Sequence, residues 1–264
     1  MHKLAPSPRT HHTSSSGTQV PEPRRSTAAR RRTSALMLSS VVAGSAVLAM
    51  ASPASAVGVV GPVSNINGAG TAFPASYQDP DGVKLVPCLT PAHCGGAAAE
   101  DVTAPDGEFF YNLVEGNVGG FRVVMGLEGA FVEDGTPVTF NRLRFRNSNA
   151  TPGATYKIVH PYGTTTVTAD SRGRARSDKV RADEGCDPAP GDSCNFAAAM
   201  GAGSAYTKFL TAANDKDASD GFLDNDGALS TITGSPTGNN FVAVYKDGKF
   251  VEQLNRFTVQ AQTR

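Results

Sequence analysis

The residues best suited to chemistry in this sequence are the acidic ones between positions 214 and 227. The stretch NDKDASDGFLDNDG crowds oxygen-bearing side chains into one segment, at Asp215, Asp217, Ser219, Asp220, Asp224 and Asp226. Calcium takes six to eight oxygen ligands, and loops rich in aspartate are typical of its sites. This cluster is therefore the candidate metal site, with calcium as the candidate cofactor.

The spacing of the acidic cluster departs from that of an EF-hand. Counted from Asp215, the first, third, fifth and twelfth positions carry oxygen side chains, but the sixth position is Asp220. An EF-hand loop needs glycine at that sixth position, and Gly221 comes one residue too late. We therefore favour a solvated acidic loop over an irregular calcium site.

The four cysteines form two pairs that are close in sequence, Cys88 with Cys94 and Cys186 with Cys194. An even number of cysteines in an exported protein predicts disulfides. Proline, glycine and aspartate inside the two short loops suit tight turns, which favours local pairing. The alternative is a four-thiolate zinc site, but both gaps are longer than the two to four residues usual between zinc-binding cysteines.

Arg142, Arg144 and Arg146 alternate with Leu143 and Phe145. On a β-strand, alternate residues point to one face, so the three arginines form a ladder. Such a ladder is a candidate binding site for an anion or an acidic glycan. The competing interpretation, which we favour, is a solvent-facing row paired across strands with aspartate or glutamate.

Nucleophilic catalysis finds little support in the sequence. Residues 57–264 contain two histidines, His93 and His160, and no serine in a G-x-S-x-G context. A catalytic histidine needs a nucleophile and an acid beside it. The phrase His-Pro-Tyr-Gly around His160 favours a residue at a turn that donates a hydrogen bond to backbone. Metalloprotease histidine pairs and phosphate-binding loops followed by lysine are also missing from the sequence.

Residues 1–56 predict a cleavable signal peptide with a long basic n-region. Arginines at 24, 25 and 30–32 precede an apolar run over 35–50, and Ala54-Ser55-Ala56 supplies a cleavage site. The apolar run is shorter than the roughly 20 residues of a spanning helix, and an uncleaved anchor is the alternative. The pair Arg31-Arg32 also permits twin-arginine export.

Cleavage of this leader changes the charge of the protein. It removes seven of 24 basic residues and one of 24 acidic residues, which leaves 17 basic and 23 acidic residues and a net charge of −6. An acidic protein has no general electrostatic attraction for nucleic acid or anionic membranes. No second long apolar segment follows, so we expect no membrane span in the mature chain and no nucleic-acid partner.

The pattern of residues 57–264 predicts an all-β, sandwich-like fold. Apolar residues alternate at period two, and Gly, Pro, Asn and Asp interrupt them at turns. Asp247-Gly248 between two such runs predicts a hairpin. We expect two β units, 57–175 and 176–264, or one continuous domain. The alanine-rich segment 195–213 predicts a short helical segment.

Four phrases together resemble a group of secreted, uncharacterised bacterial proteins. They are YQDPDGVKLVPCL from Tyr77, FNRLRFR from Phe140, YKIVHPYG from Tyr156 and TGSPTGNNF from Thr233. The resemblance covers nearly all of 57–264, and it implies a β-rich exported protein of bacterial origin without assigning a catalytic role. The similar proteins continue from the Gly-Ser-Pro phrase into a glycine-rich stretch, whereas this chain has the hairpin 242–251.

These observations predict a secreted binding or structural module that acts on an extracellular or cell-envelope ligand. The rival class is a secreted hydrolase built from carboxylates, with Glu108 or Glu128 paired with an aspartate of the 215–226 cluster. Paired carboxylates at glycosidase separation in one cleft would favour the hydrolase. A toxin or inhibitor using the 88–94 loop is a third class.

Overall fold

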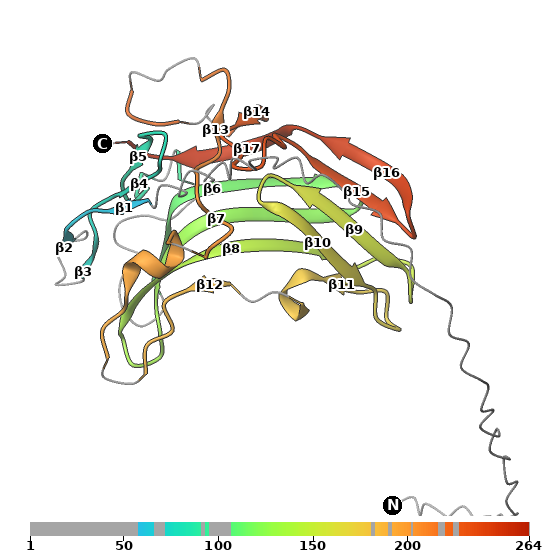
Figure 1. Ribbon diagram of the computed structural model, residues 1–264, viewed down its shortest axis with the longest axis horizontal. Helices are drawn as coiled ribbons and strands as arrows, with labels where there is room; N and C mark the ends of the chain where they lie inside the picture. The colour runs from blue at the N-terminus through green and yellow to red at the C-terminus, as the bar shows by residue number, and fades with distance from the viewer. Residues whose placement is uncertain are drawn as a thin grey trace, which may run out of the picture. The chain divides into compact units, whose positions relative to one another are not determined.

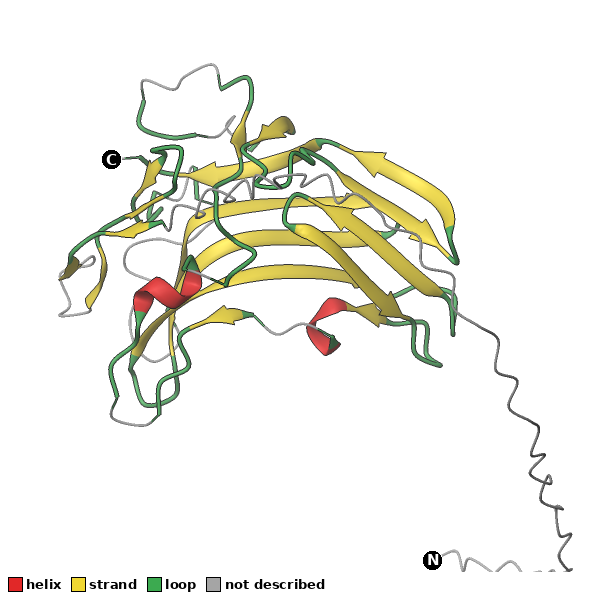
Figure 2. Cartoon of the chain, in the orientation of Figure 1, coloured by secondary structure: helices red, strands yellow, loops and turns green. Residues whose placement is uncertain are grey.

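The computed structural model describes residues 58–65, 72–90, 93–94, 107–180, 183–189, 192–201, 203–215, 220–223 and 227–263. Ala51–Arg264 form one compact unit, and the predicted leader lies outside the described residues. Strands dominate the unit, and the helical segments drawn in Figure 2 are short. The all-β fold expected from the alternating pattern is confirmed.

The larger sheet has the strand order β11-β8-β7-β6-β17-β14-β13, and β12 also pairs with β8 (Figure 1). Its strands are β6 Glu108–Val118, β7 Phe121–Phe131, β8 Pro137–Asn147, β11 Ala175–Arg176, β12 Glu184–Gly185, β13 Thr211–Ala212, β14 Ser230–Thr233 and β17 Arg256–Ala261. β6, β7 and β8 are antiparallel neighbours of 11 residues each. They form the platform on which the candidate site is built.

Side chains alternate between the two faces of this platform. Along β7, Val123, Met125 and Leu127 join the buried core, whereas Arg122 and Val124 lie on the outer face. A register shift in β6 between Phe110 and Asn112 interrupts the alternation. Two consecutive residues at this bulge, Tyr111 and Asn112, are both fully buried, and the shift leaves Glu108 and Phe110 on the outer face.

The smaller sheet has the order β10-β9-β15-β16, and all of its pairings are antiparallel. Its strands are β9 Thr155–His160, β10 Gly163–Thr168, β15 Val242–Lys246 and β16 Lys249–Leu254. The predicted hairpin joins β15 to β16. Asp247 and Gly248 have φ values of 48° and 79°, as a two-residue turn with left-handed backbone requires.

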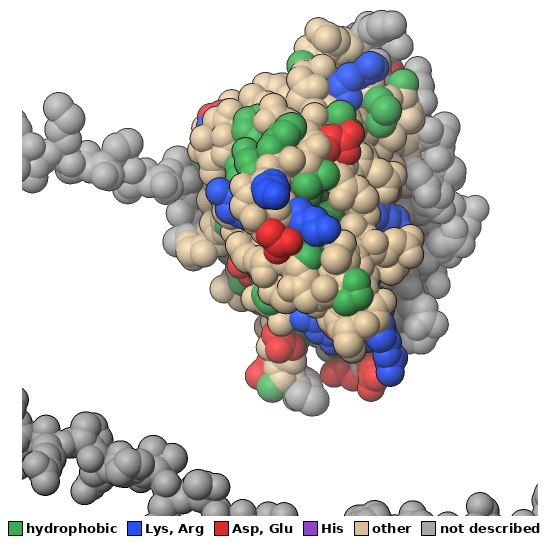
Figure 3. Space-filling model, turned by 90° about the vertical axis from the view of Figure 1, so that its right-hand side faces the viewer, with side chains coloured by type: hydrophobic (Ala, Val, Ile, Leu, Met, Phe, Trp, Pro, Cys, Tyr) green, Lys and Arg blue, Asp and Glu red, His purple; other side chains and the backbone are tan. Residues whose placement is uncertain are grey.

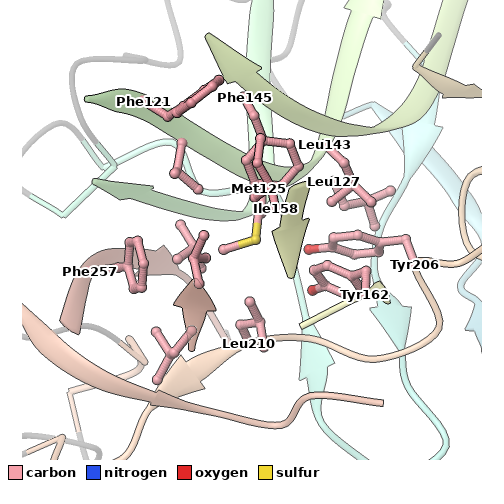
Figure 4. Close-up of a cluster of buried hydrophobic side chains, with 14 of the residues drawn as sticks. Phe121, Met125, Leu127, Leu143, Phe145, Ile158, Tyr162, Tyr206, Leu210 and Phe257 are labelled. Carbon is pink, nitrogen blue, oxygen red and sulfur yellow. The ribbon is translucent and has the colours of Figure 1, made fainter. Parts of the chain in front are cut away.

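The two sheets pack face to face over one core. The ring of Phe121 on β7 lies 5.2 Å from that of Tyr156 on β9, and Phe145 on β8 lies 4.7 Å from His160. Figure 4 shows apolar side chains from both sheets meeting in this layer, with Tyr162 and Tyr206 stacked at one side. The sandwich leaves the opposite face of the larger sheet outside this core.

Five short strands precede the platform. They form one sheet of order β1-β4-β5 and the pair β2-β3, with β1 Val59–Val60, β2 Val63–Asn65, β3 Ala72–Pro74, β4 Tyr77–Gln78 and β5 Lys84–Leu85. The turn between β4 and β5 is built on Asp79, whose carboxylate accepts hydrogen bonds from the amides of Asp81 and Val83. Tyr77 and Phe73 from these strands pack in the hydrophobic core.

The expected division near residue 176 falls inside the larger sheet. β17 pairs with β6, and β11 and β12 pair with β8, so strands from both sides of that division share one sheet. This pairing corresponds to the expected alternative of one continuous domain. After residue 170, the strands β11 and β12 pair with β8 along the edge that faces away from β7 (Figure 1).

Helix is confined to two 3-10 turns in the described residues, Ser177–Lys179 and Phe196–Ala199. The helical segment expected over 195–213 is thus only the second of these turns. Asn141 donates from its side chain to the carbonyl of Ala199 and to the hydroxyl of Ser204. These tertiary bonds hold the chain in an irregular path past the turn. Within the described residues, no helix has the length and apolar character to cross a membrane.

β16 is exposed along its whole length. Phe250 and Val251 have exposed fractions of 60% and 46%. Figure 3 looks onto the side where β15 and β16 lie, and hydrophobic side chains there are interspersed with charged ones.

Candidate functional site

Charged side chains line two adjoining hollows on the outer face of β6, β7 and β8. The first hollow has a volume of about 530 Å³, and its polar lining includes Glu108, Arg142, Asp183 and Asp187. The second has a volume of about 400 Å³ and is lined by Glu108, Phe110, Leu113, Glu115, Arg122, Val124, Arg142, Arg144, Arg146 and Gln260. Glu108 and Arg142 belong to both hollows and mark the boundary between them.

The arginine ladder predicted from the sequence lies on β8 and lines the second hollow. Arg142, Arg144 and Arg146 stand opposite Gly126, Val124 and Arg122 of β7. Gly126 must lack a side chain, because a Cβ there would come within 2.8 Å of the Asn112 carbonyl oxygen. The missing side chain leaves room on the outer face between Arg142 and β6.

The segment along the free edge of β8 supplies carboxylates to the ladder. Asp183, just before β12, pairs with both Arg142 and Arg144. Asp178, in the first 3-10 turn, lies 3.4 Å from Arg146, and this guanidinium helps to lower the pKa of Asp178 below its ordinary value despite partial burial. The ladder is therefore paired with acids, chiefly from the edge segment rather than from directly opposite strand positions.

Glu128 is the least expected member of the site. It lies on the outer side of β7 between Phe110 of β6 and Phe140 of β8, and its side chain has no exposed surface. Burial of an ionised carboxylate is unfavourable unless it is paired. Its partner is Arg142, whose Nη1 lies 2.5 Å from Glu128 Oε2 and 3.0 Å from Glu108 Oε1.

The electrostatics of this cluster shift the pKa of Glu128 upward. Burial raises its pKa well above the ordinary value, Arg142 opposes the rise, and the nearby carboxylates of Glu108 and Asp183 add to it. Neither carboxyl oxygen of Glu128 has a hydrogen-bond partner among the described residues, and Arg142 is its charged contact. Burial lowers the pKa of Arg142, but the surrounding carboxylates outweigh this effect and the net shift is upward. Besides Glu128, the cluster contains the acids Glu108 and Asp183 and the guanidinium groups of Arg142 and Arg144.

The two hollows differ in the sign of their charge. The first is lined by three carboxylates and one guanidinium, and the second by four guanidiniums and two carboxylates. Apolar side chains form part of each lining, including Phe131 and Phe140 in the first and Phe110 in the second. An amphipathic ligand therefore finds both apolar and charged contacts, and an anion is favoured in the second hollow.

The structure brings Glu108 and Glu128 together, but not in the way glycoside hydrolysis requires. In retaining enzymes the two carboxyl groups stand about 5–5.5 Å apart on either side of the scissile bond. Here both contact the same guanidinium nitrogen of Arg142, and Glu128 is fully covered. The aspartates expected to partner them, Asp215 and Asp220, line neither hollow.

Both predicted disulfides are present. Cys88 bonds to Cys94 and Cys186 bonds to Cys194, each with a Cα–Cα distance of 5.5 Å. Cys186 also lines the first hollow, so its bridge anchors the segment that carries Asp183 and Asp187.

The two histidines lie away from the hollows. His160 is buried at the end of β9, where its Nδ1 accepts from the Tyr162 amide and its Nε2 lies 3.0 Å from the Thr165 hydroxyl. His160 thus accepts a backbone hydrogen bond at its turn, whereas the expected role was to donate one to backbone. His93 stacks on Phe222, with 3.9 Å between ring centroids.

Most of the predicted calcium ligands lie outside the described residues. These are Asp217, Ser219, Asp224 and Asp226. Of the others, Asp220 accepts a hydrogen bond from the Phe222 amide, and Asp215 follows β13. Among the residues with described positions, no group of three or more His, Cys, Asp or Glu side chains could hold a metal ion.

Several residues of the two hollows were not singled out from the sequence. They are Glu115, Arg122, Asp183, Asp187 and Gln260. Arg122 alternates with the apolar residues of β7, so the sequence pattern alone predicts that its side chain points outward. Which residues of other strands lie next to it depends on the strand order of the sheet. Gln260 reaches the site only because β17, from the end of the chain, pairs with β6.

Comparisons with protein-family models, with curated proteins and with solved structures find no match to this chain.

Proposed function

We propose that the protein is an exported, extracellular binding module whose ligand site is the outer face of β6, β7 and β8. The observation that carries this proposal is the pair of adjoining hollows built over the buried acid Glu128. A buried carboxyl with a strongly raised pKa reduces stability at neutral pH. Such groups concentrate at functional sites. The two hollows beside Glu128 offer space in which a ligand can bind.

Export is supported by the two disulfides, because such bridges persist in oxidising compartments outside the cytoplasm. The sequence adds a basic n-region, an apolar core and the Ala54-Ser55-Ala56 cleavage site. Mass spectrometry of the protein from its native host tests this part. A mature N-terminus at Val57 in the medium supports export with cleavage, and an intact leader in the membrane fraction would overturn it.

Binding is favoured over hydrolysis because the acid pair cannot flank a substrate bond. A hydrolase built on Glu108 is the second candidate, since Glu108 has a side chain 43% exposed and lies in both hollows. An assay of glycan cleavage separates the binding module from the hydrolase. Hydrolysis would release new reducing ends from a bound glycan, and a Glu108→Gln variant would abolish that release while binding continued.

A groove-filling substitution tests the binding site. Val124 lines the second hollow from the centre of β7, so Val124→Trp fills the hollow without removing a charge. The matched control is Thr166→Trp on the exposed side of β10 in the other sheet. Both variants are first checked for an unchanged circular dichroism spectrum.

The three proteins are then applied to an array of neutral, anionic and cationic glycans and peptides. We expect at least one class to bind the unmodified protein and the Thr166→Trp variant, and to be lost with Val124→Trp. Equal binding by all three proteins would place the site elsewhere. Absence of binding to the whole array would remove the support for a binding function.

A further inference from the structure

We infer that the second hollow binds an anionic glycan, a chain of sugars that bears carboxylate, sulfate or phosphate groups. This inference rests on the proposed binding function and names the ligand class of the same site.

The first support is the gathering of arginines in this hollow, because their mutual repulsion does not favour folding. Arg122 on β7 stands directly opposite Arg146 on β8, and like charges in such cross-strand positions are destabilising. The residues from 57 onward carry a net charge of −6, yet this hollow gathers four guanidiniums and two carboxylates. Arginines outnumber acids in the lining itself, while Asp183 and Asp178 beside it pair with Arg142, Arg144 and Arg146. The gathering of four guanidiniums on one face of an acidic protein favours an anionic ligand there.

The second support is incomplete pairing at the Arg146 end of the hollow. Arg146 reaches Asp178 only at 3.4 Å, and its Nε is buried without a hydrogen-bond partner. Gln260 Oε1 is likewise buried without a partner, although its side chain lines the same hollow. Arg122 pairs with Glu115 at 2.8 Å but keeps 69% of its side chain exposed. Guanidinium groups hydrogen-bond oxyanions, and a side-chain amide hydrogen-bonds hydroxyls.

The third support is the shape and spacing of the lining. Arg144 and Arg146 are two residues apart on one strand, which separates their backbone positions by about 7 Å. They are therefore placed to contact oxyanions on different units of a chain rather than one isolated ion. Phe110, Leu113 and Val124 provide apolar surface between the charges, against which the C–H face of a sugar ring can pack. Together these contacts match a carbohydrate with repeated negative charge.

The test measures binding of galacturonate oligomers by calorimetry, against galactose oligomers of equal length and against inorganic phosphate. Arg122→Gln and Arg146→Gln remove one charge each from the hollow, and Arg172→Gln removes one from an exposed turn as the charge-matched control. We expect each hollow variant to weaken galacturonate binding about ten-fold, which corresponds to about 1.4 kcal/mol. The control should bind normally, and higher salt should weaken binding throughout.

The outcomes separate this inference from the proposed function. Binding of galacturonate that the two hollow variants weaken, with neutral galactose at least ten-fold weaker, supports the inference. Equal binding of the neutral oligomer at the hollow overturns the anionic class but leaves a binding module in place. Phosphate that competes as well as the oligomer overturns the glycan and leaves a simple anion site. Failure of the galacturonate oligomer to bind overturns the inference, and the array experiment then decides the proposed function separately.

Discussion

The raised pKa of Glu128 predicts an unusual result for the substitution Glu128→Gln: the variant should be more stable than the unmodified protein at neutral pH. Glutamine keeps the size of glutamate and carries no charge at any pH. The substitution therefore removes an ionisable group from a fully covered position without opening a cavity.

The sign of this stability difference follows from the raised pKa of Glu128. Below the ordinary glutamate pKa of 4.5, the folded and unfolded chains both hold the proton, and Glu128 contributes no pH dependence. Above it the unfolded chain releases the proton while the folded chain keeps it, so stability falls as pH rises toward the folded-state pKa. The slope is at most about 1.4 kcal/mol per pH unit. The variant should escape this loss, which predicts an advantage of up to about 3 kcal/mol at pH 7.

Urea unfolding of the chain from Val57 onward, at several pH values between 4.5 and 8, measures this difference. The matched control is Glu133→Gln at the exposed turn after β7, for which we expect no comparable trend. A Glu128→Gln variant that is less stable than the unmodified protein at pH 7 would refute the reasoning. It would mean that Glu128 is ionised and that its pair with Arg142 outweighs burial.

Three further predictions concern the sandwich itself. Gly129→Ala should destabilise the fold by about 1–3 kcal/mol through overpacking, because the new Cβ would come within 2.3 Å of the Phe109 ring. Thermal melting measures this loss, and an unchanged melting temperature would refute the close contact. Tyr206→Phe should lose about 1–3 kcal/mol in urea unfolding, since the Tyr206 hydroxyl donates to buried Asn112 Oδ1 at 2.7 Å, and a neutral effect would contradict that bond. Reduction of both disulfides should lower stability by about 2–3 kcal/mol per bridge, measured by melting with and without reductant, and equal melting curves would show that the bridges contribute little.

Local sequence signals predicted much of the fold. Alternation predicted the strands, Asp247-Gly248 predicted the β15–β16 hairpin, and close spacing predicted both disulfides. The extent of helix over 195–213 was overestimated, because alanine content favours helix while hydrogen bonds from Asn141 hold an irregular path. The pairing of β17 with β6 joins the end of the chain to its middle, and no local pattern encodes that contact.

The candidate site was predictable only in part. The arginine ladder followed from alternation, but its acid partners did not. Glu108 meets Glu128 because of the register between β6 and β7, and the bulge at residues 111–112 changes that register. Asp183 meets Arg144 because the segment before β12 folds back along β8. Each of these side-chain contacts depends on how distant strands pair, which the alternation of apolar residues along one strand does not specify.

The central claim, that the outer face of β6, β7 and β8 binds a ligand, is tested most directly by mapping a ligand footprint. Backbone amide shifts of the mature chain, recorded by NMR during titration with a galacturonate oligomer, locate that footprint residue by residue. The account predicts the largest shifts at Arg122, Val124, Arg144 and Arg146, with little change along β10 and β16. A footprint on β16 or on the 88–94 loop, with the outer face unchanged, would contradict it.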